Sequence, residues 1–348
     1  MLLGVLRNLS NIHDYTTTIL KHHGGTLMFK GPCLTNINFI LTSDPLNVLH
    51  ITSRNFGNYG RAILHSLFKN ESFGRFLQQI IQKKLESCLL PFLNHASKTG
   101  VQFIEFSEFA YEKAFNKMED AIFYRHIVPR CLWKLQKWLQ IGQEKKFNES
   151  QKMAKGKEQI DDKFLRDTAI NLQAAGRDTI SAGLRWLFWL VSTHPLVEAK
   201  ILEEIKDNFK TNEENCLASG VKGLDKLVYL HGAICEAFRL FPPVPFEHNP
   251  NTMVYYSLYS MGRMEQTWRK DCLEFRPERW ISEKGGNIHV PSYKSCLDRN
   301  ISFVQMKIVV IALLWNFKVQ VVEGHHVSPS VSVVLHMKHG LKVKVTKR

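Results

Sequence analysis

The segment from Lys163 to Ser192 constrains the fold of this 348-residue chain more than any other part of the sequence. Small and apolar residues recur in it at alternating spacings of four and three, which indicates one face of an α-helix. These positions are Leu165, Ala169, Leu172, Gly176, Thr179, Gly183, Trp186 and Leu190. The second half is apolar on nearly every side, as is typical of a helix buried inside a large domain. We therefore predict one long, largely buried helix that His194-Pro195 ends.

The pattern in the rest of the chain predicts further helices and a small β part. Helical spacing predicts helices over residues 13–23, 45–52, 72–93, 106–123, 195–209, 224–241 and 297–315. Two β-rich runs predict a hairpin over residues 26–30 and 37–42, and three short strands are predicted over 318–322, 331–336 and 341–345. This pattern predicts a mainly α fold with a segregated β part, an α+β architecture. We treat residues 1–348 as a single domain in which 140–163 form a charged, exposed helix or linker.

Composition excludes several classes of protein. The formal charge is +14, but the basic residues are spread along the chain and no nucleic-acid-binding motif accompanies them. A solvated basic surface is therefore favoured and nucleic acid is not expected as a partner, while a basic helical module for an anionic partner stays open as a minor alternative. The longest apolar run, Ile308 to Trp315, is far shorter than the roughly 20 residues of a membrane span. The seven scattered cysteines indicate reduced thiols.

The first candidate site lies in the middle of the long predicted helix. Ala175 and Gly176 would let a flat, bulky group approach the backbone, and a glycine inside a helix costs roughly 1 kcal/mol relative to alanine. Asp178 and Thr179 would add a carboxylate and a hydroxyl in apolar surroundings. A close helix crossing, with Thr179 bonded to its own helix and Asp178 paired with a base, explains the same residues. The bare pattern slightly favours this structural explanation.

The second candidate site is the pair Glu236 and Arg239, whose spacing of three brings both side chains to one helix face. On an exposed face such a pair would contribute only about 0.2–0.5 kcal/mol. The neighbouring residues are apolar, however, and a buried pair needs further partners to offset desolvation. Arg276 and Arg279 are the candidates. We predict a contact between Glu236 and Arg279, with Arg239 in the same network.

Three motifs then stand in a fixed order. Residues 175–179 read Ala-Gly-Arg-Asp-Thr, residues 236–245 read Glu-x-x-Arg followed by Leu-Phe-Pro-Pro-Val-Pro, and residues 275–280 read Phe-Arg-Pro-Glu-Arg-Trp. Each motif alone is weak, but the ordered set resembles the cytochrome P450 haem-thiolate monooxygenases. Residues 175–200, 229–248 and 323–348 are most similar to the plant branch that hydroxylates fatty acids and long alkanes. The resemblance extends over nearly the whole chain.

The resemblance implies the cytochrome P450 fold and a role for the first candidate site. The helix that carries Ala175 and Gly176 would be the distal helix above the haem, with Gly176 opening it toward the cofactor. Asp178 and Thr179 would relay protons during oxygen activation. We expect Ala175, Gly176 and Thr179 to face a cavity whose opposite wall lies near Cys296.

On the other side of the haem, Cys296 would be the axial thiolate of the iron, whose electron donation favours cleavage of the O–O bond. Glu236, Arg239 and Arg279 would form the structural triad beneath the haem. The implied partners are a reductase that supplies electrons from NADPH and an aliphatic small-molecule substrate. The implied location is the endoplasmic reticulum membrane, but this sequence shows no membrane anchor. We therefore expect a soluble or cytosol-facing chain, and contact with a membrane surface stays open.

Several departures from the family pattern weaken the expected haem site. The family's haem loop reads Phe-x-x-Gly-x-Arg-x-Cys-x-Gly, whereas residues 291–298 have no Phe, Gly or Arg at those places and Asp298 replaces the final Gly. The early Trp and Arg that hold the haem propionates are missing, and segments after residue 59 and after residue 248 look shortened. Loss of groups around a metal ligand commonly costs 10–100-fold in affinity. We therefore predict a truncated, internally deleted member that carries little haem, with a non-catalytic remnant as the alternative.

Overall fold

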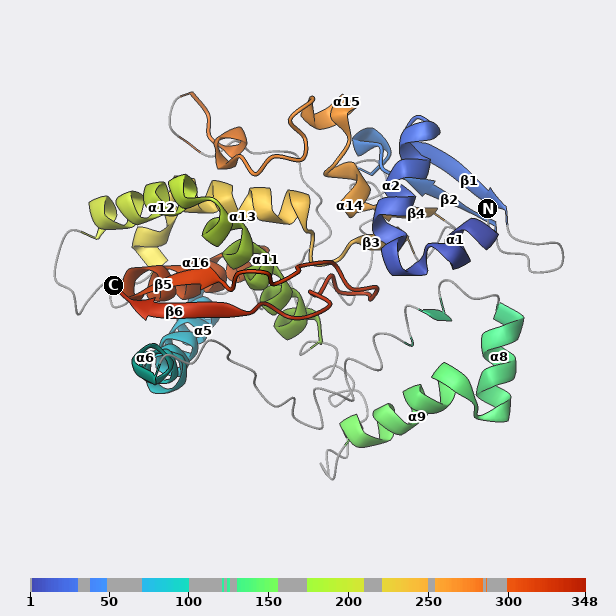
Figure 1. Ribbon diagram of the computed structural model, residues 1–348, viewed down its shortest axis with the longest axis horizontal. Coiled ribbons are helices and arrows are strands. Elements are labelled where there is room, and N and C mark those ends of the chain that lie inside the picture. The colour runs from blue at the N-terminus through green and yellow to red at the C-terminus, as the bar shows by residue number, and fades with distance from the viewer. Residues whose placement is uncertain are drawn as a thin grey trace.

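The computed structural model shows a helical core with two small sheets at its periphery (Figure 1). It describes residues 2–30, 38–48, 71–99, 121, 124–125, 130–155, 174–209, 221–249, 254–283, 286 and 299–348. The predictions for 49–52, for most of 106–123 and for 163–173 fall outside these residues. Among the helices in the described ranges, none combines the length and the hydropathy needed to cross a bilayer.

Four helices build the core. They are α11 (Thr179–Thr193), α12 (Pro195–Asn208), α13 (Val228–Leu240) and α16 (Arg299–Asn316). Leu187, Ile201, Ile234 and Ile311 are buried in one cluster that all four helices share. Gly183 lets α11 approach α13 closely, because a Cβ at this position would lie 2.6 Å from the Phe238 ring. The close crossing considered for residues 174–179 is not found at Gly176 among the described residues; it lies two turns later, at Gly183.

The long predicted helix is confirmed from residue 174 onward, with a change at its start. Residues Ala174–Asp178 form a π-helical turn, which leads directly into α11. Such turns inside helices are rare and recur at functional sites. A similar turn, Leu85–Leu89, joins α5 (Glu71–Lys84) to α6 (Leu90–Thr99), so the helix predicted over 72–93 is longer than expected.

The helix predicted over 224–241 starts later than expected. Val221–Lys226 form a 3₁₀ turn, and α13 begins only at Val228. Leu227 has a non-helical backbone and is fully buried. The buried ammonium of Lys307 donates to the carbonyls of Leu224 and Leu227 at 2.7 and 3.1 Å, which stabilises the break in the helix.

The N-terminal sheet has the strand order β1-β2-β4-β3. Its strands are β1 (Thr26–Lys30), β2 (Asn38–Thr42), β3 (Phe246–Asn249) and β4 (Val254–Ser257). The antiparallel pairing of β1 with β2 confirms the predicted hairpin. The pairing of β3 with β4 was not predicted, since the chain after residue 248 looked shortened. The parallel pairing of β2 with β4 joins residues 40–42 to residues 254–256, which are far apart in the sequence.

The C-terminal prediction is partly wrong. Strands β5 (Phe317–Val321) and β6 (Val343–Lys347) pair antiparallel, but residues 331–336 form no strand. The amide of Leu335 donates to the carbonyl of Pro243 at 2.8 Å, and the Trp186 indole donates to the Leu335 carbonyl at 2.7 Å. These bonds occupy the backbone groups that a sheet ladder would use. Alternating apolar residues here reflect docking onto α11, not pairing between strands.

Two helices lie to one side of the core in Figure 1, α8 (Arg130–Leu139) and α9 (Gly142–Lys155). The segment predicted to be charged and exposed begins at the end of α8 and includes α9. Lys145, Lys146 and Glu149 are exposed, but Glu144 is fully buried. Its carboxylate accepts hydrogen bonds from Arg125 Nε and Nη2 at 2.7 and 2.8 Å, which compensates the buried charge.

Helix α2 (Ile12–His22), which agrees with the prediction over 13–23, docks onto the chain through a buried histidine. His13 Nε2 lies 3.3 Å from the Ser330 carbonyl, and the ring stacks on Phe246 with a centroid distance of 5.3 Å. Burial lowers the pKa of His13 to about 4. The neutral imidazole therefore ties α2 to segments that are distant in sequence.

This burial predicts a pH dependence of stability. Because the pKa of His13 is about 4 in the folded chain and about 6.5 in the unfolded chain, the unfolded state binds the proton first as the pH falls. We expect the contribution of His13 to be complete above pH 6.5 and to fall by about 3 kcal/mol by pH 4. Urea unfolding of the wild type and of His13→Gln across this range measures it. His23→Gln, at an exposed position, is the control and should keep the wild-type slope; the same slope in His13→Gln would contradict the assignment.

A second prediction concerns Trp186, which is 1% exposed and stacks on Phe241 with a centroid distance of 4.0 Å. We expect Trp186→Ala to lower the free energy of unfolding by about 3–5 kcal/mol, because it removes a packed ring and leaves a cavity. Trp138, which is 79% exposed, offers the matched control, and Trp138→Ala should change stability by less than about 0.5 kcal/mol. Equal losses for the two variants in denaturant titrations would refute this account of the core.

Candidate functional site

The central feature of the candidate site is a carboxylate buried inside the helical core. Glu236 and Arg239 both lie on α13, three positions apart, so the helix itself brings their side chains together. Glu236 is 0% exposed and Arg239 is 5% exposed. An ionised carboxylate at such a position is stable only when hydrogen bonds replace its lost hydration.

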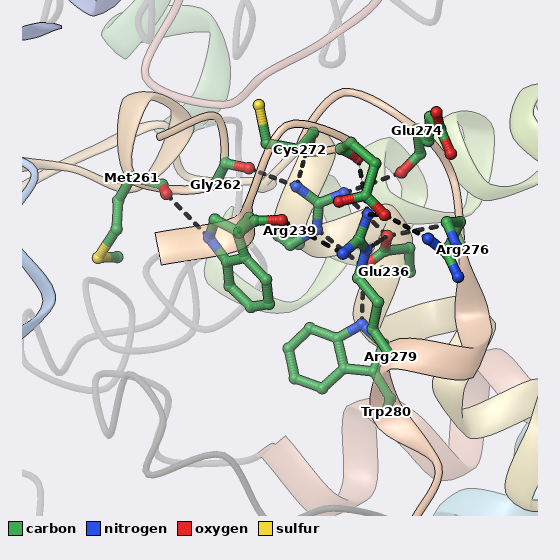
Figure 2. A network of polar contacts seen from close by, with 11 residues as sticks. Glu236, Arg239, Met261, Gly262, Cys272, Glu274, Arg276, Arg279 and Trp280 are labelled. Atoms are coloured by element: carbon green, nitrogen blue, oxygen red, sulfur yellow. Dashed lines mark hydrogen bonds and ion pairs between the residues drawn. The ribbon is translucent and has the colours of Figure 1, made fainter. Parts of the chain in front are cut away.

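Five hydrogen bonds reach the Glu236 carboxylate, drawn in Figure 2. Arg239 donates two of them in a bidentate pair, each at 2.8 Å. Arg279 Nε donates at 3.2 Å, the backbone amide of Arg276 at 3.1 Å, and the Trp280 indole at 2.8 Å. The carboxylate thus accepts from two guanidinium groups, one amide and one indole, and its charge is fully compensated.

Arg239 uses all five of its N–H donors. Besides its two bonds to Glu236, it donates to the carbonyls of Gly262, Cys272 and Glu274, the last two at 2.6 and 3.0 Å. Its guanidinium also lies over the Trp268 ring, 5.0 Å from the centroid. These three carbonyls belong to the segment between α14 (Leu258–Met261) and the 3₁₀ turn Pro277–Trp280, which also contains the short helix α15 (Glu265–Trp268). One arginine therefore fixes the path of this segment against α13.

Arg279 closes the network from the 3₁₀ turn. Its Nη2 donates to the Asp271 carbonyl at 2.7 Å and also pairs with the Asp271 carboxylate at 2.7 Å. The pKa of Asp271 is held below its usual range, chiefly by the hydrogen bond from Arg279. The same carboxylate pairs with the Arg276 guanidinium. The network thus extends from the buried Glu236 to the surface.

The expected contact between Glu236 and Arg279 is present, and Arg239 shares the same network. Arg276, the other candidate, joins through its backbone amide while its guanidinium points to Asp271. Sequence reasoning missed the Trp280 indole as a donor. Its position directly after Arg279 in the Arg-Pro-Glu-Arg-Trp segment was the available signal.

The other candidate residues lie where the π-helical turn meets α11. A Cβ built on Gly176 would meet no atom of the described residues within 4 Å, so with respect to these residues the backbone there is open to a flat group. Asp178 is 3% exposed, and its Oδ1 accepts from Arg177 Nε at 2.8 Å. Its Oδ2 is buried and accepts no hydrogen bond from the part of the chain that the structure describes. Thr179, half-buried, is the first residue of α11.

This geometry confirms one part of the structural explanation of the motif. Asp178 pairs with a neighbouring base, but the pairing leaves one buried oxygen without a hydrogen bond from the described residues. Such atoms are uncommon in folded proteins, and a catalytic role is one of their explanations. The space beside Gly176 would accept a flat group, and Asp178 places a carboxylate oxygen two positions further along the chain.

Cys296 and the loop around it lie outside the described residues, so the distance from the sulfur to Gly176 stays a prediction. Ala175 lies inside the π-helical turn, one residue before Gly176. In the described part of the chain, no group of three or more His, Cys, Asp and Glu side chains could hold a metal ion. The described cysteines Cys88, Cys235 and Cys272 form no disulfide bond.

Comparison with known proteins agrees with this arrangement. The family model described as Cytochrome P450 matches residues 81–345. Alkane hydroxylase MAH1 of Arabidopsis thaliana is 34% identical, over 100% of this chain and 92% of its own length. Noroxomaritidine synthase 2 of Narcissus aff. pseudonarcissus MK-2014 is 32% identical over 100% and 90%, and Cytochrome P450 86B1 of Arabidopsis thaliana is 30% identical over 99% and 85%.

A solved structure shares the fold. The crystal structure of a Cytochrome P450 (CYP102L1) has a TM-score of 0.66 and 15% identity, covering 97% of this chain and 98% of that one. The alignment with the alkane hydroxylase spans 466 positions, although this chain has 348 residues. The alignment therefore leaves internal gaps in this chain, in agreement with the shortened segments inferred from the sequence.

The buried network predicts that the negative charge of Glu236 has a large effect on the stability of the fold. We expect Glu236→Gln to lower the free energy of unfolding by about 3–5 kcal/mol, because it leaves two guanidinium groups without their anion. Glu278 is a matched control, since it pairs with Lys200 at 2.6 Å but keeps 46% of its side chain exposed. Glu278→Gln should cost no more than about 1 kcal/mol. Equal costs for the two variants in denaturant unfolding would show that the network contributes no more than a surface pair.

Proposed function

This chain belongs to the cytochrome P450 family, in its plant fatty-acid and alkane hydroxylase branch, and from that premise we propose that it hydroxylates aliphatic chains with a haem held by Cys296. The observation that supports the proposal most directly is the Glu236 network. It joins the Glu-x-x-Arg motif to the Phe-Arg-Pro-Glu-Arg-Trp motif in the order in which the family carries them. The named activity of the alkane hydroxylase relative, which aligns over the whole chain, supports the aliphatic substrate.

We assign the distal role to the start of α11. Gly176 leaves room beside the helix backbone for the face of the haem, which when bound supplies oxygen activation. Asp178 would hold or pass a proton at Oδ2, the oxygen that has no hydrogen-bond partner. Arg177 orients the carboxylate through Oδ1, and Thr179 places a hydroxyl one residue further along the chain.

We assign the proximal and structural roles as the family order suggests. Cys296 would hold the iron, and Glu236, Arg239 and Arg279 would fix the scaffold on which that side of the site depends. A reductase that draws on NADPH would supply the electrons. The endoplasmic reticulum membrane is the proposed location, by analogy with the plant family.

We further propose that haem binding is weak in this chain. The internal gaps against its relatives and the altered residues around Cys296 remove groups that shield the thiolate and hold the propionates. Losses of about 10–100-fold for each such group lower the affinity, even where the factors do not multiply. A remnant of the family that no longer turns over is the second candidate function, and the same gaps favour it.

The ratio of haem to protein and the carbon monoxide spectrum of the reduced protein test both candidates. We expect the purified chain to carry much less than one haem and to show no thiolate-type band. A stoichiometric, stable band in the purified protein would contradict the weak binding. After addition of excess haem, a thiolate-type band is expected, because the ligand Cys296 is still present.

Matched cysteine variants identify the ligand. Cys296→Ala should abolish the band formed with added haem, whereas Cys272→Ala, at a buried free thiol, should keep it. Absence of any thiolate band with excess haem would overturn the monooxygenase proposal and leave the remnant. A band that survives Cys296→Ala would place the ligand elsewhere.

A further inference from the structure

A groove of about 470 Å³ lies at the C-terminal end of α11, on the opposite end of this helix from Thr179. This volume falls within the range of small-molecule sites. Its walls are mainly apolar and come from α11, from the end of α13 and from the loop after Cys272. These walls are Trp189, Leu190, Leu240, Phe241, Leu273 and Phe275.

Arg263 brings a buried charge to the lining of this groove. Its side chain is 7% exposed, and it forms no ion pair with a carboxylate of the described residues. The guanidinium lies over the rings of Tyr259 and Phe241, 3.5 and 5.0 Å from the centroids. Its Nη1 donates to the Tyr259 carbonyl at 3.2 Å. A guanidinium has five donors, so this contact leaves most of its capacity unused.

Asp14 acts on Arg263 through its charge and partly offsets the effect of burial on the pKa of Arg263, but among the described residues no ion pair joins the two side chains. The Asp14 carboxylate instead accepts a hydrogen bond from the Tyr259 hydroxyl at 2.9 Å. Burial lowers the pKa of Arg263 to about 10, so the group still carries its charge at neutral pH. A buried cation that forms no ion pair with the described residues is unfavourable. Arg239, by contrast, has all five of its donors bonded.

Other ionisable groups on the groove lie at its surface. Glu274 and Arg276 are exposed, and Arg276 is already paired with Asp271. His194 is half-buried, with Nδ1 2.7 Å from the Leu190 carbonyl. Among the described residues that line the groove, Arg263 is therefore the single buried charge.

We propose that this groove binds an amphipathic organic acid, whose carboxylate accepts hydrogen bonds from Arg263 while its apolar body lies along Trp189, Leu240 and Phe241. Charge-assisted bonds between a guanidinium and a carboxylate are strong and directional, and the apolar walls bury the rest of the ligand. Trp189 lies ten positions beyond Thr179, about 15 Å along the helix axis. The groove is therefore separate from Asp178 and Thr179.

Decanoate and 1-decanol, which share a chain length but differ in charge, test the proposal on the full-length protein. Isothermal titration calorimetry, together with quenching of tryptophan fluorescence, reports binding. We expect saturable binding of decanoate and at least tenfold weaker binding of 1-decanol, because only the acid can pair with the buried cation. Equal affinity for the two compounds would overturn the proposal.

Two kinds of variant locate the binding in this groove. Arg263→Gln should weaken decanoate binding by about tenfold or more, with little change for 1-decanol. Leu273 is 65% exposed at the groove, so its variants should fold normally. Leu273→Glu should weaken decanoate binding several-fold by repulsion, while Leu273→Arg should not weaken it. If Arg263→Gln does not fold, the Leu273 pair decides; unchanged decanoate affinity in Leu273→Glu would place the binding elsewhere and refute the site.

Discussion

The buried carboxylate of Glu236 is the interaction on which the arrangement of the core depends. A carboxylate with no exposure costs several kcal/mol in lost hydration unless hydrogen bonds replace it. Five donors do so here, and they come from α13, from the loop that follows α14 and from the 3₁₀ turn at Pro277. Segments up to 44 positions apart are thus fixed by one side chain. The network also makes Arg239 a brace for the segment 262–274, whose only described helix is the short α15 (Glu265–Trp268).

The packing of α11 against α13 and Phe241 leaves a different environment at each end of this helix. Gly183 allows the closest approach to α13 in the middle of the helix, and Trp186 stacks on Phe241 one turn later. At the N-terminal end the backbone is open at Gly176, and a buried oxygen of Asp178 lacks a partner. The C-terminal end borders the groove with Arg263. The apolar middle of α11 therefore separates two polar groups. Near one end, Asp178 Oδ2 has no hydrogen-bond partner among the described residues, and at the other end the Arg263 guanidinium has no ion pair with them.

Much of this could be predicted from the sequence where the signal is a spacing of side chains. The pair Glu236 and Arg239 was predicted because a spacing of three among apolar residues requires a buried pair with further partners. Backbone donors leave no such signal, so the Arg276 amide was missed. Residues 331–336 alternate like a strand, but the Trp186 indole and the Pro243 carbonyl take their backbone groups, a tertiary effect that local pattern does not contain.

We infer that the Glu236 network, made of the chain's own residues, holds the core together whether or not haem is bound. Hydrogen exchange of the haem-free protein tests it through two protons that donate to this carboxylate, the Arg276 amide and the Trp280 indole. We expect both to exchange as slowly as the best-protected amides of α13, because opening the network requires global unfolding. Exchange of either proton orders of magnitude faster than those amides would show that the network opens locally, and would contradict its role as the brace of the fold.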